Sequence, residues 1–434
     1  MNVKQVAINL ISQVDKGAYS NIALNETFKT LNINSKEKAF MTEIFYGVLR
    51  NKKFLDYIIE KNTKEIKKEW IRNLLRISIY QITFMDSDNK GIVWEATELA
   101  KKYSIAISKF INGTLRNYLR NKDSELKNLA DEKNYEVLYS IPKWFYNILE
   151  KQYRNENLKQ AITSLKKVPY LSVRVNKLKY TEKEFEEFLK EKDIQIIKKV
   201  DTVYYINSGL IINSEEFKTG KIIAQDASSY LAAKNLEVIP NELVLDICAA
   251  PGGKTAVLAE NMENRGEIIA IDIHQHKIKL IDTNMKKLGI DIVKANVMDA
   301  RNVNKQGRKF DKILVDVPCS GYGVIRKKPE ILYSKNRENI EELAKLQLEI
   351  LNSAADILKD GGELIYSTCT ITDEENTNNI EKFLKEREEF KVEKLYIPKN
   401  VSGDYDSLGG FCINYKEEIM DNFYIIKLKK GEKC

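Results

Sequence analysis

The chain has 434 residues, of which 43% are hydrophobic and 9% aromatic, which excludes wholesale disorder and favours two or three domains with packed cores. No apolar run approaches the ~18 residues of a membrane span, and the first ten residues lack the apolar stretch of a signal peptide, so we expect a cytoplasmic protein. The net charge of +7 is uneven: residues 1–240 carry 40 Lys and Arg against 30 Asp and Glu, and residues 241–434 carry 30 against 33.

Residues 1–135 are predicted to be helical throughout. In KEKAFMTEIFYGVLRNKKFLDYIIEK the apolar residues recur at helical spacing, for example at Phe40, Ile44 and Val48. Glycine is scarce here, and the first proline of the chain is at position 142. The basic balance of this half favours a helical domain that binds a polyanion such as nucleic acid, although lysine-rich solvated faces would give the same count.

Residues 136–238 are predicted to form a small α+β module. The stretches PYLSVRVNKL and VDTVYYINSGLII are rich in Val, Ile and Tyr, as strands are, and they flank a helical TEKEFEEFLKEK. Basic residues such as Arg174 and Lys177 lie near Tyr170 and Tyr180, which suggests contacts with RNA bases. Solvated strand edges are an equally good interpretation of any one of them.

Residues 239–434 alternate strand-like and helix-like segments, from ELVLDI to NFYIIKLKK. This alternation predicts a doubly wound, mostly parallel sheet with helices on both faces. Ligands of such sheets bind beyond the carboxyl ends of the strands. The candidate catalytic and binding residues of this chain lie at those ends.

The loop in LVLDICAAPGGKTAVLAE follows the first of these strands. Gly253, Lys254 and Thr255 fit the end of a phosphate-binding P-loop, but the P-loop's first glycine is replaced by Cys248. A nucleoside-cofactor site instead needs an acid at the end of the second strand, about 20 residues further on. Asp272 stands there, and two further strands end near Asp299 and Asp316, so the row of acids favours the nucleoside-cofactor site over the NTPase.

The five cysteines include no C-x-x-C pair, and the chain has two histidines, so neither a disulfide framework nor a metal centre is expected. Cys412 and Cys434 are interpreted as packing residues. Cys319 in DVPCSGYG and Cys369 in YSTCT each follow a strand that ends at the predicted cofactor site. The hydroxyl groups and the helix start expected around Cys369 are features that lower the pKa of a thiol.

Two thiols beside a methyl donor suit the methylation of cytosine at carbon 5. That carbon is a poor nucleophile until a thiolate adds to carbon 6 and turns the ring into an enamine. An acid near the ring nitrogen assists the addition, and a base then removes the proton from carbon 5.

Four motifs together resemble the RNA 5-methylcytosine methyltransferase superfamily: DICAAPGGKT, IAIDI, DVPCSG and YSTCT. Two helical stretches resemble the NusB-like helical domain of its ribosomal branch, namely AFMTEIFYGVLRNKKFLD and WEATELAKKYSIAISKFINGTLRN. Two shorter stretches also match that branch: VRVN and IIAQDASSYLAA. The whole chain is covered, and it is most similar to the RsmB (Sun) type of small-subunit (16S) ribosomal RNA cytosine-C5 methyltransferases.

The resemblance implies a NusB-like RNA-binding domain at 1–135, a small α+β RNA-binding module at 136–238, and a Rossmann-like methyltransferase domain at 239–434. It implies that Cys369 is the nucleophile, that Cys319 is needed for product release, and that Asp316 lines the site. S-adenosylmethionine would be bound with Asp272 on the ribose, Asp299 on the adenine, and a loop made of Cys248, Ala249, Ala250, Pro251, Gly252, Gly253 and Lys254. We expect a monomer that acts on ribosomal RNA rather than on the assembled subunit, without a metal or a membrane.

One segment departs from the family pattern. The family has a proline-containing segment that leads to D-G-F-F, whereas this chain reads CINYKEEIMDNFYIIKL, with Asn422 in place of the glycine. Two alternatives to a ribosomal RNA methyltransferase stay open. One is the same chemistry on transfer RNA, and the other is a non-catalytic NusB-like RNA-binding factor. A DNA cytosine methyltransferase is disfavoured, because that class attacks with the cysteine of its Pro-Cys motif and has no use for STCT.

Overall fold

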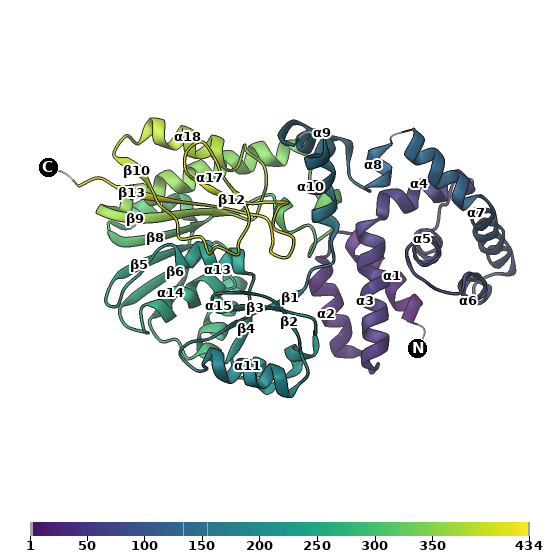
Figure 1. Cartoon of the computed structure of the whole chain (residues 1–434), viewed down its shortest axis with the longest axis horizontal. Coiled ribbons are helices and arrows are strands. Elements are labelled where there is room, and N and C mark those ends of the chain that lie inside the picture. Colours follow the sequence, from purple (N-terminus) through teal and green to yellow (C-terminus); the bar gives the residue numbers. More distant parts are fainter. Residues whose placement is uncertain (1–2, 133, 154, 433–434) are drawn as a thin grey trace. The chain divides into compact units, whose positions relative to one another are not determined.

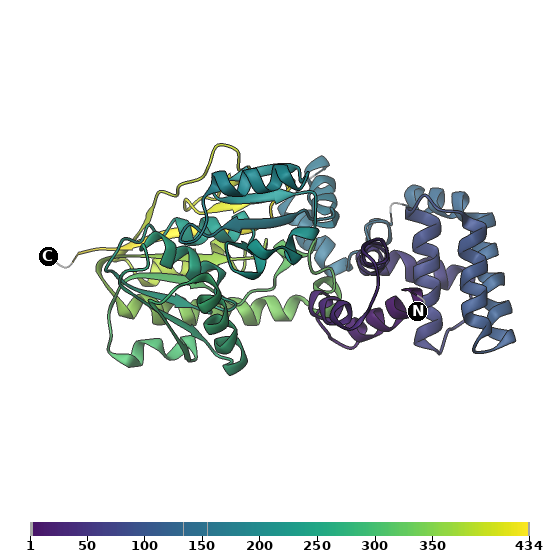
Figure 2. The same cartoon turned by 90° about the horizontal axis from the view of Figure 1, so that it is seen from below.

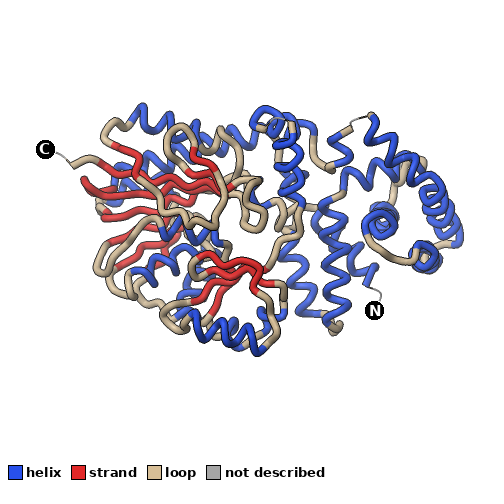
Figure 3. Tube along the Cα trace, in the orientation of Figure 1, coloured by secondary structure: helices blue, strands red, loops and turns tan. Residues whose placement is uncertain are grey.

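The computed structural model describes residues 3–132, 134–153 and 155–432, which fall into two compact units. The first unit comprises residues 1–166 and 325–336, and the second comprises 167–324 and 337–434. In the described residues the strands, red in Figure 3, all belong to the second unit. No helix in this described part of the chain is long and apolar enough to cross a bilayer.

The first unit is helical, as predicted for residues 1–135 (Figures 1 and 2). Its helices begin where side chains can cap them: Asn34 and Glu37 form a capping box at α3, and Ser104 caps α7. The helices are α1 Val3–Asp15, α2 Ser20–Thr30, α3 Ser35–Arg50, α4 Lys52–Asn62, α5 Glu69–Phe84, α6 Asn89–Lys101, α7 Ile105–Asp131, α8 Tyr135–Leu138, α9 Lys143–Gln152, α10 Glu156–Lys166 and α16 Ile331–Ser334.

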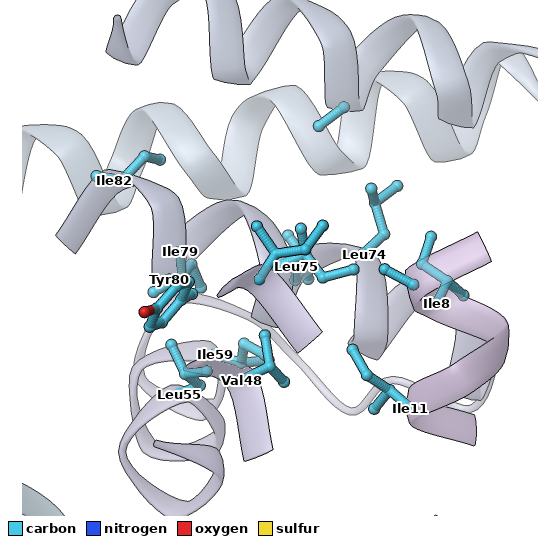
Figure 4. Close-up of a cluster of buried hydrophobic side chains, with 14 of the residues drawn as sticks. Ile8, Ile11, Val48, Leu55, Ile59, Leu74, Leu75, Ile79, Tyr80 and Ile82 are labelled. Carbon is cyan, nitrogen blue, oxygen red and sulfur yellow. The ribbon is translucent and has the colours of Figure 1, made fainter. Parts of the chain in front are cut away.

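Helix α5 forms the centre of this unit. Its residues from Asn73 to Ile82 are all buried, and a helix that is buried all round belongs in a core. Figure 4 shows Leu74 and Leu75 of α5 among side chains from neighbouring helices, including Ile8 of α1 and Val48 of α3. Each of these side chains is at most 1% exposed.

Residues 325–336 belong to the helical unit although they lie far from its other residues in the sequence. The Arg50 guanidinium donates to the carbonyl of Arg326 at 3.1 Å, and the Tyr333 hydroxyl donates to the carbonyl of Ser140 at 2.9 Å. The chain therefore leaves the second unit after Val324, just beyond the Cys319 turn, and returns to it at α17.

A small antiparallel sheet opens the second unit. Its strand order is β2-β3-β1-β4, and α11 connects β1 to β2. The stretch predicted as a strand up to Ile212 ends earlier, because the Asn207 side chain accepts from the Gln195 backbone and a short 3-10 helix follows. The elements are β1 Leu171–Val175, α11 Glu182–Glu191, β2 Ile196–Val200, β3 Val203–Ile206, η1 Leu210–Asn213, α12 Glu215–Lys218 and β4 Ile222–Ala224.

The large sheet has the order β11-β12-β13-β9-β8-β5-β6-β7, with β10 paired to β13. Strands β7, β6, β5, β8 and β9 are parallel, as predicted, and the C-terminal strands add an antiparallel edge that makes the sheet mixed. The elements are α13 Ala227–Lys234, β5 Leu243–Ile247, α14 Gly253–Asn261, β6 Glu267–Asp272, α15 Gln275–Leu288, β7 Val293–Val297, η2 Ala300–Gln306, β8 Phe310–Asp316, η3 Tyr322–Val324, α17 Arg337–Ile357, β9 Leu358–Thr368, α18 Thr377–Glu386, β10 Phe390–Glu393, β11 Asp404–Tyr405, β12 Phe411–Ile413 and β13 Phe423–Lys430.

Helices cover both faces of the large sheet. Along β8, Leu314 packs in the cluster that contains α13, α14 and α15, whereas Ile313 and Val315 pack in the cluster that contains α17 and α18. This alternation is the period of two that a strand buried on both faces requires. The polar residues that end the parallel strands therefore gather at one edge.

A buried ion pair joins the small sheet to the large one. The Arg174 guanidinium on β1 contacts Glu260 of α14 and donates to Gln225 at 2.6 Å. Both charged side chains are at most 2% exposed. The suggestion that Arg174 contacts RNA is therefore wrong, because its charge is used inside the protein.

We predict that Glu260→Ala destabilises the protein by about 3–5 kcal/mol, because it leaves the Arg174 charge buried without its partner. Urea unfolding followed by circular dichroism measures the change. Glu381→Ala, which removes an exposed partner of Lys385, is the control and should unfold like the unmodified protein. Equal unfolding midpoints for both variants would contradict the role given to the ion pair.

Candidate active site

The loop after β5 combines small side chains with unusual backbone angles. Cys248 has φ +59°, Gly252 has φ +97°, and the peptide bond between Ala250 and Pro251 is cis. Residues with a side chain rarely adopt the φ of Gly252, so glycine suits this position. Helix α14 starts immediately afterwards and turns its N-terminal backbone toward the loop.

A cavity of about 150 Å³ lies against this loop. Its lining includes Ala249, Gly253 and Lys254 of the loop region together with Asp246 and Asp316. A larger cavity, of about 950 Å³, adjoins Asn261 at the other end of α14 and includes none of the predicted site residues. The smaller cavity is the one lined by residues of the predicted site, although neither Cys319 nor Cys369 lines it.

Four aspartates lie at the ends of the adjacent parallel strands β8, β5, β6 and β7. Asp316 and Asp272 are the last residues of their strands, Asp246 is the last but one of β5, and Asp299 follows β7 by two residues. The row predicted from the sequence thus follows four neighbouring strands, and Asp246 is the member that the sequence analysis missed.

Two of these aspartates have basic partners on the next element. Asp272 accepts from the His274 backbone at 3.2 Å and from the Lys277 ammonium at 3.3 Å. Asp299 accepts from the guanidinium of Arg301, and this hydrogen bond lowers the pKa of Asp299. Neither residue lines the small cavity, so both lie further along the edge of the sheet.

Lys254 is bound to Asp316. Its ammonium lies 2.8 Å from one carboxylate oxygen, and the Ser367 hydroxyl donates to the other at 2.7 Å. Burial opposes the charged form of Lys254, but Asp316 outweighs it, and the pKa of Lys254 is raised. A P-loop lysine must be available to phosphate, and this one is occupied by Asp316.

The two candidate thiols are adjacent. Cys369 directly follows β9, and Cys319 lies three residues beyond the end of the neighbouring strand β8. Their Sγ atoms are 2.9 Å apart. Residues 50 positions apart in the sequence thus form one site.

The hydrogen bond to the Cys369 sulfur, followed by burial, raises the pKa of Cys319 well above that of an ordinary thiol. At this distance one sulfur can donate its S–H to the other, so a single proton can be shared between the two thiols. The expected helix start is not beside Cys369, because α18 begins at Thr377.

The other cysteines are not placed for attack. Burial raises the pKa of Cys248 and of Cys412 to about 12, which makes both inert thiols. Cys434 lies outside the described residues. In the described part of the chain, no group of three or more His, Cys, Asp or Glu residues could hold a metal ion.

The atypical C-terminal segment packs against both cysteine loops. The Asn422 backbone donates to the carbonyl of Gly323 at 3.2 Å, and the Gly323 backbone donates to the carbonyl of Cys369 at 2.9 Å. A Cβ atom on Gly323 would lie 2.1 Å from the Asn422 carbonyl oxygen. The position that departs from the family pattern therefore forms part of the wall around the thiols.

We predict that Asp246→Asn reduces the loss of stability between pH 5 and pH 8. Burial raises the pKa of Asp246 from 3.8 to about 7. The folded state therefore holds a proton that the unfolded chain releases near pH 4, and the resulting stabilisation is lost as the pH rises through 7.

Thermal unfolding midpoints at several pH values test this prediction. The midpoint of Asp246→Asn should fall less with rising pH, whereas Asp360→Asn, at an exposed carboxylate, should follow the unmodified protein. Parallel curves for all three proteins would mean that Asp246 is charged throughout this range.

Comparisons with known proteins agree with this arrangement. The family model described as 16S rRNA methyltransferase RsmB/F matches residues 233–429, the NusB family model matches 1–120, and a model of the RsmF/B-like ferredoxin-like domain matches 141–215. The solved structure of PH0851 is 30% identical, covers 99% of both chains, and has a TM-score of 0.84.

Two curated relatives extend over nearly the whole chain. The probable ribosomal RNA small subunit methyltransferase B of Bacillus subtilis is 34% identical and covers 99% of each chain, and the ribosomal RNA small subunit methyltransferase B of Shewanella oneidensis is 32% identical over 99% of this chain and 100% of its own. With this identity along its full length, and with a NusB domain followed by a Rossmann-like methyltransferase fold, the chain belongs to the RsmB/F family of 16S rRNA methyltransferases.

Proposed function

We propose that this protein methylates carbon 5 of a cytosine in small-subunit ribosomal RNA through a covalent adduct with Cys369. The observation that carries the proposal is the pair of thiols 2.9 Å apart, beside the ion pair of Lys254 and Asp316. The reaction needs a thiol that activates the ring and further groups that move protons, and this site offers each of them.

S-adenosylmethionine fits the loop at residues 248–254. The loop presents small side chains and open backbone to the small cavity, and one buried carboxyl oxygen of Asp246 has no hydrogen-bond partner among the described residues. We assign the ribose hydroxyls to Asp272 and the adenine amine to Asp299, at the ends of the next two strands. The bound cofactor supplies a methyl group carried on a positively charged sulfur.

In the first step the Cys369 thiolate forms a bond to carbon 6 of the cytosine. The electrons of the carbon 5–carbon 6 double bond move into the ring, toward the nitrogen at position 3. The Lys254–Asp316 pair holds an exchangeable proton, and we assign it to that nitrogen, where it makes carbon 6 more electrophilic. Carbon 5 then has the electron density that it needs to accept the methyl group.

In the second step Cys319 acts on the methylated adduct. Once Cys369 is bonded to carbon 6 it no longer carries charge, so the main cause of the raised pKa of Cys319 is gone. Cys319 can then lose its proton to solvent and, as a thiolate, remove the proton from carbon 5. The electrons of that C–H bond re-form the ring double bond, the carbon–sulfur bond breaks, and the Cys369 thiolate is restored. The proton on the nitrogen at position 3 returns to the Lys254–Asp316 pair, which leaves neutral 5-methylcytosine.

We predict opposite results for the two cysteine variants. Cys369→Ala should form no adduct and transfer no methyl group, because the bond to carbon 6 cannot form. Cys319→Ala should attack and then stall, so a protein–RNA species that survives denaturing electrophoresis should accumulate. Both variants are incubated with S-adenosylmethionine and unmodified 16S rRNA, with Cys412→Ala as the control that keeps full activity.

Trapping in Cys369→Ala instead would exchange the two roles, and mild, similar losses would reduce both cysteines to packing residues. The same gel with unmodified transfer RNA tests the substrate. A shifted band with transfer RNA but none with 16S rRNA would overturn the ribosomal assignment. No band and no methyl transfer with either RNA would favour a non-catalytic RNA-binding factor.

We further predict that Asp272→Asn and Asp299→Asn each weaken the binding of S-adenosylmethionine by roughly 1.5–3 kcal/mol, because each loses a hydrogen bond that involves a charged carboxylate. Calorimetric titration measures the affinity, and RNA binding should be nearly unchanged. Asp282→Asn, at an exposed position of α15, is the matched control. Unchanged affinity in both site variants would place the cofactor elsewhere.

A further inference from the structure

Glu375 is a fully buried carboxylate close to the two thiols. It lies between β9 and α18 and has 0% exposure. Its first oxygen accepts from the Ser320 backbone at 2.8 Å and from the Gln347 amide at 2.9 Å. Its second oxygen accepts from the hydroxyls of Ser320 and Thr372, at 2.5 and 2.7 Å.

Three of these four donor groups come from the two cysteine loops, and the fourth is on α17. Ser320 directly follows Cys319, and its hydroxyl is also 2.6 Å from that of Thr370, which directly follows Cys369. The Gln347 amide, on α17, donates in addition to the carbonyl of Pro318, at 2.9 Å. One carboxylate thus joins the residues on either side of Cys319 to the segment that follows Cys369.

The four hydrogen bonds require a carboxylate in particular. All four donors are neutral, and no ion pair with Glu375 exists among the described residues. An ionised carboxylate has about four acceptor sites and no donor, so it can satisfy all of them at once. A glutamine would replace one accepting oxygen with a group that donates, and would leave N–H or O–H groups facing it without acceptors.

We propose that Glu375 is a positioning residue, which holds the Cys319 and Cys369 loops at the separation that lets the two thiols act on one base. The catalytic meaning of this separation rests on the proposed function. The separation itself does not depend on that function, because the distance between the two thiols can be tested by a chemical reaction between them. The negative charge of Glu375 has a second, smaller effect, because it adds to the Cys369 hydrogen bond and to burial in raising the pKa of Cys319.

The decisive variant is Glu375→Gln, which keeps the size of the side chain and changes its acceptors. Ser320→Ala is the second variant, because it removes the hydroxyl that bridges Glu375 and Thr370 without adding volume. Glu374→Gln is the matched control: it is the same substitution one residue earlier, at a side chain with no hydrogen-bond partner among the described residues. Circular dichroism confirms that each variant is folded before it is assayed.

The first readout is the rate at which Cys319 and Cys369 form a disulfide with the oxidant diamide. The two S–H groups lose two protons and two electrons to the N=N bond of diamide, which becomes a hydrazine, and one S–S bond forms. Peptide mass spectrometry measures the linked product. We expect the rate to fall at least about tenfold in Glu375→Gln, to a smaller extent in Ser320→Ala, and not in Glu374→Gln.

The second readout is methyl transfer to unmodified 16S rRNA. Glu375→Gln should lower kcat about 100-fold, the scale of a misplacement by 1 Å, with KM for RNA within about threefold of the unmodified protein. A folded Glu375→Gln or Ser320→Ala protein that forms the disulfide at the original rate would overturn the proposal. If the unmodified protein transfers no methyl group, the proposed function fails, and the disulfide rates still decide whether Glu375 positions the thiols.

Discussion

The parallel pairing of β8 with β9 is the constraint on which the active site depends. Asp316 lies opposite Ser367 in this register, so the two cysteine loops leave the sheet at the same level. A slip of one residue would turn the side chains of β9 to the opposite face, and Ser367 could no longer bond to Asp316. Strand β5 on the other side of β8 brings the loop at residues 248–254 to the same place.

Buried polar groups fix the arrangement of these loops. Lys254, Asp316 and Ser367 form one chain of hydrogen bonds, and Glu375 gathers its four donors in another. In a low-dielectric interior each of these bonds is strong, and each unpaired group would be costly, so the arrangement has few alternatives. Loops that are otherwise irregular therefore keep two sulfur atoms within hydrogen-bond distance.

The small sheet contributes to the same site through Gln225. Its amide oxygen accepts from Arg174, and a Cβ atom on Gly253, at the start of α14, would lie 3.5 Å from its amide nitrogen. The other end of α14 carries Glu260, the partner of Arg174. The buried ion pair thus fixes the helix whose N-terminus faces the loop at residues 248–254, which links the stability of the small sheet to the geometry of that loop.

The sequence by itself determined the order of helices and strands, the loop between β5 and α14, and the aspartates and cysteines at strand ends. These features depend on periodicity and turn residues, which are local. Only the tertiary structure decided that Cys319 and Cys369 touch, that Arg174 is buried rather than on an RNA-binding surface, and that Glu375 joins the two loops. Each of these depends on partners 50 or more residues apart in the sequence. No local pattern encodes such pairs, because they form only when strand order and burial have brought the partners together and removed water from between them.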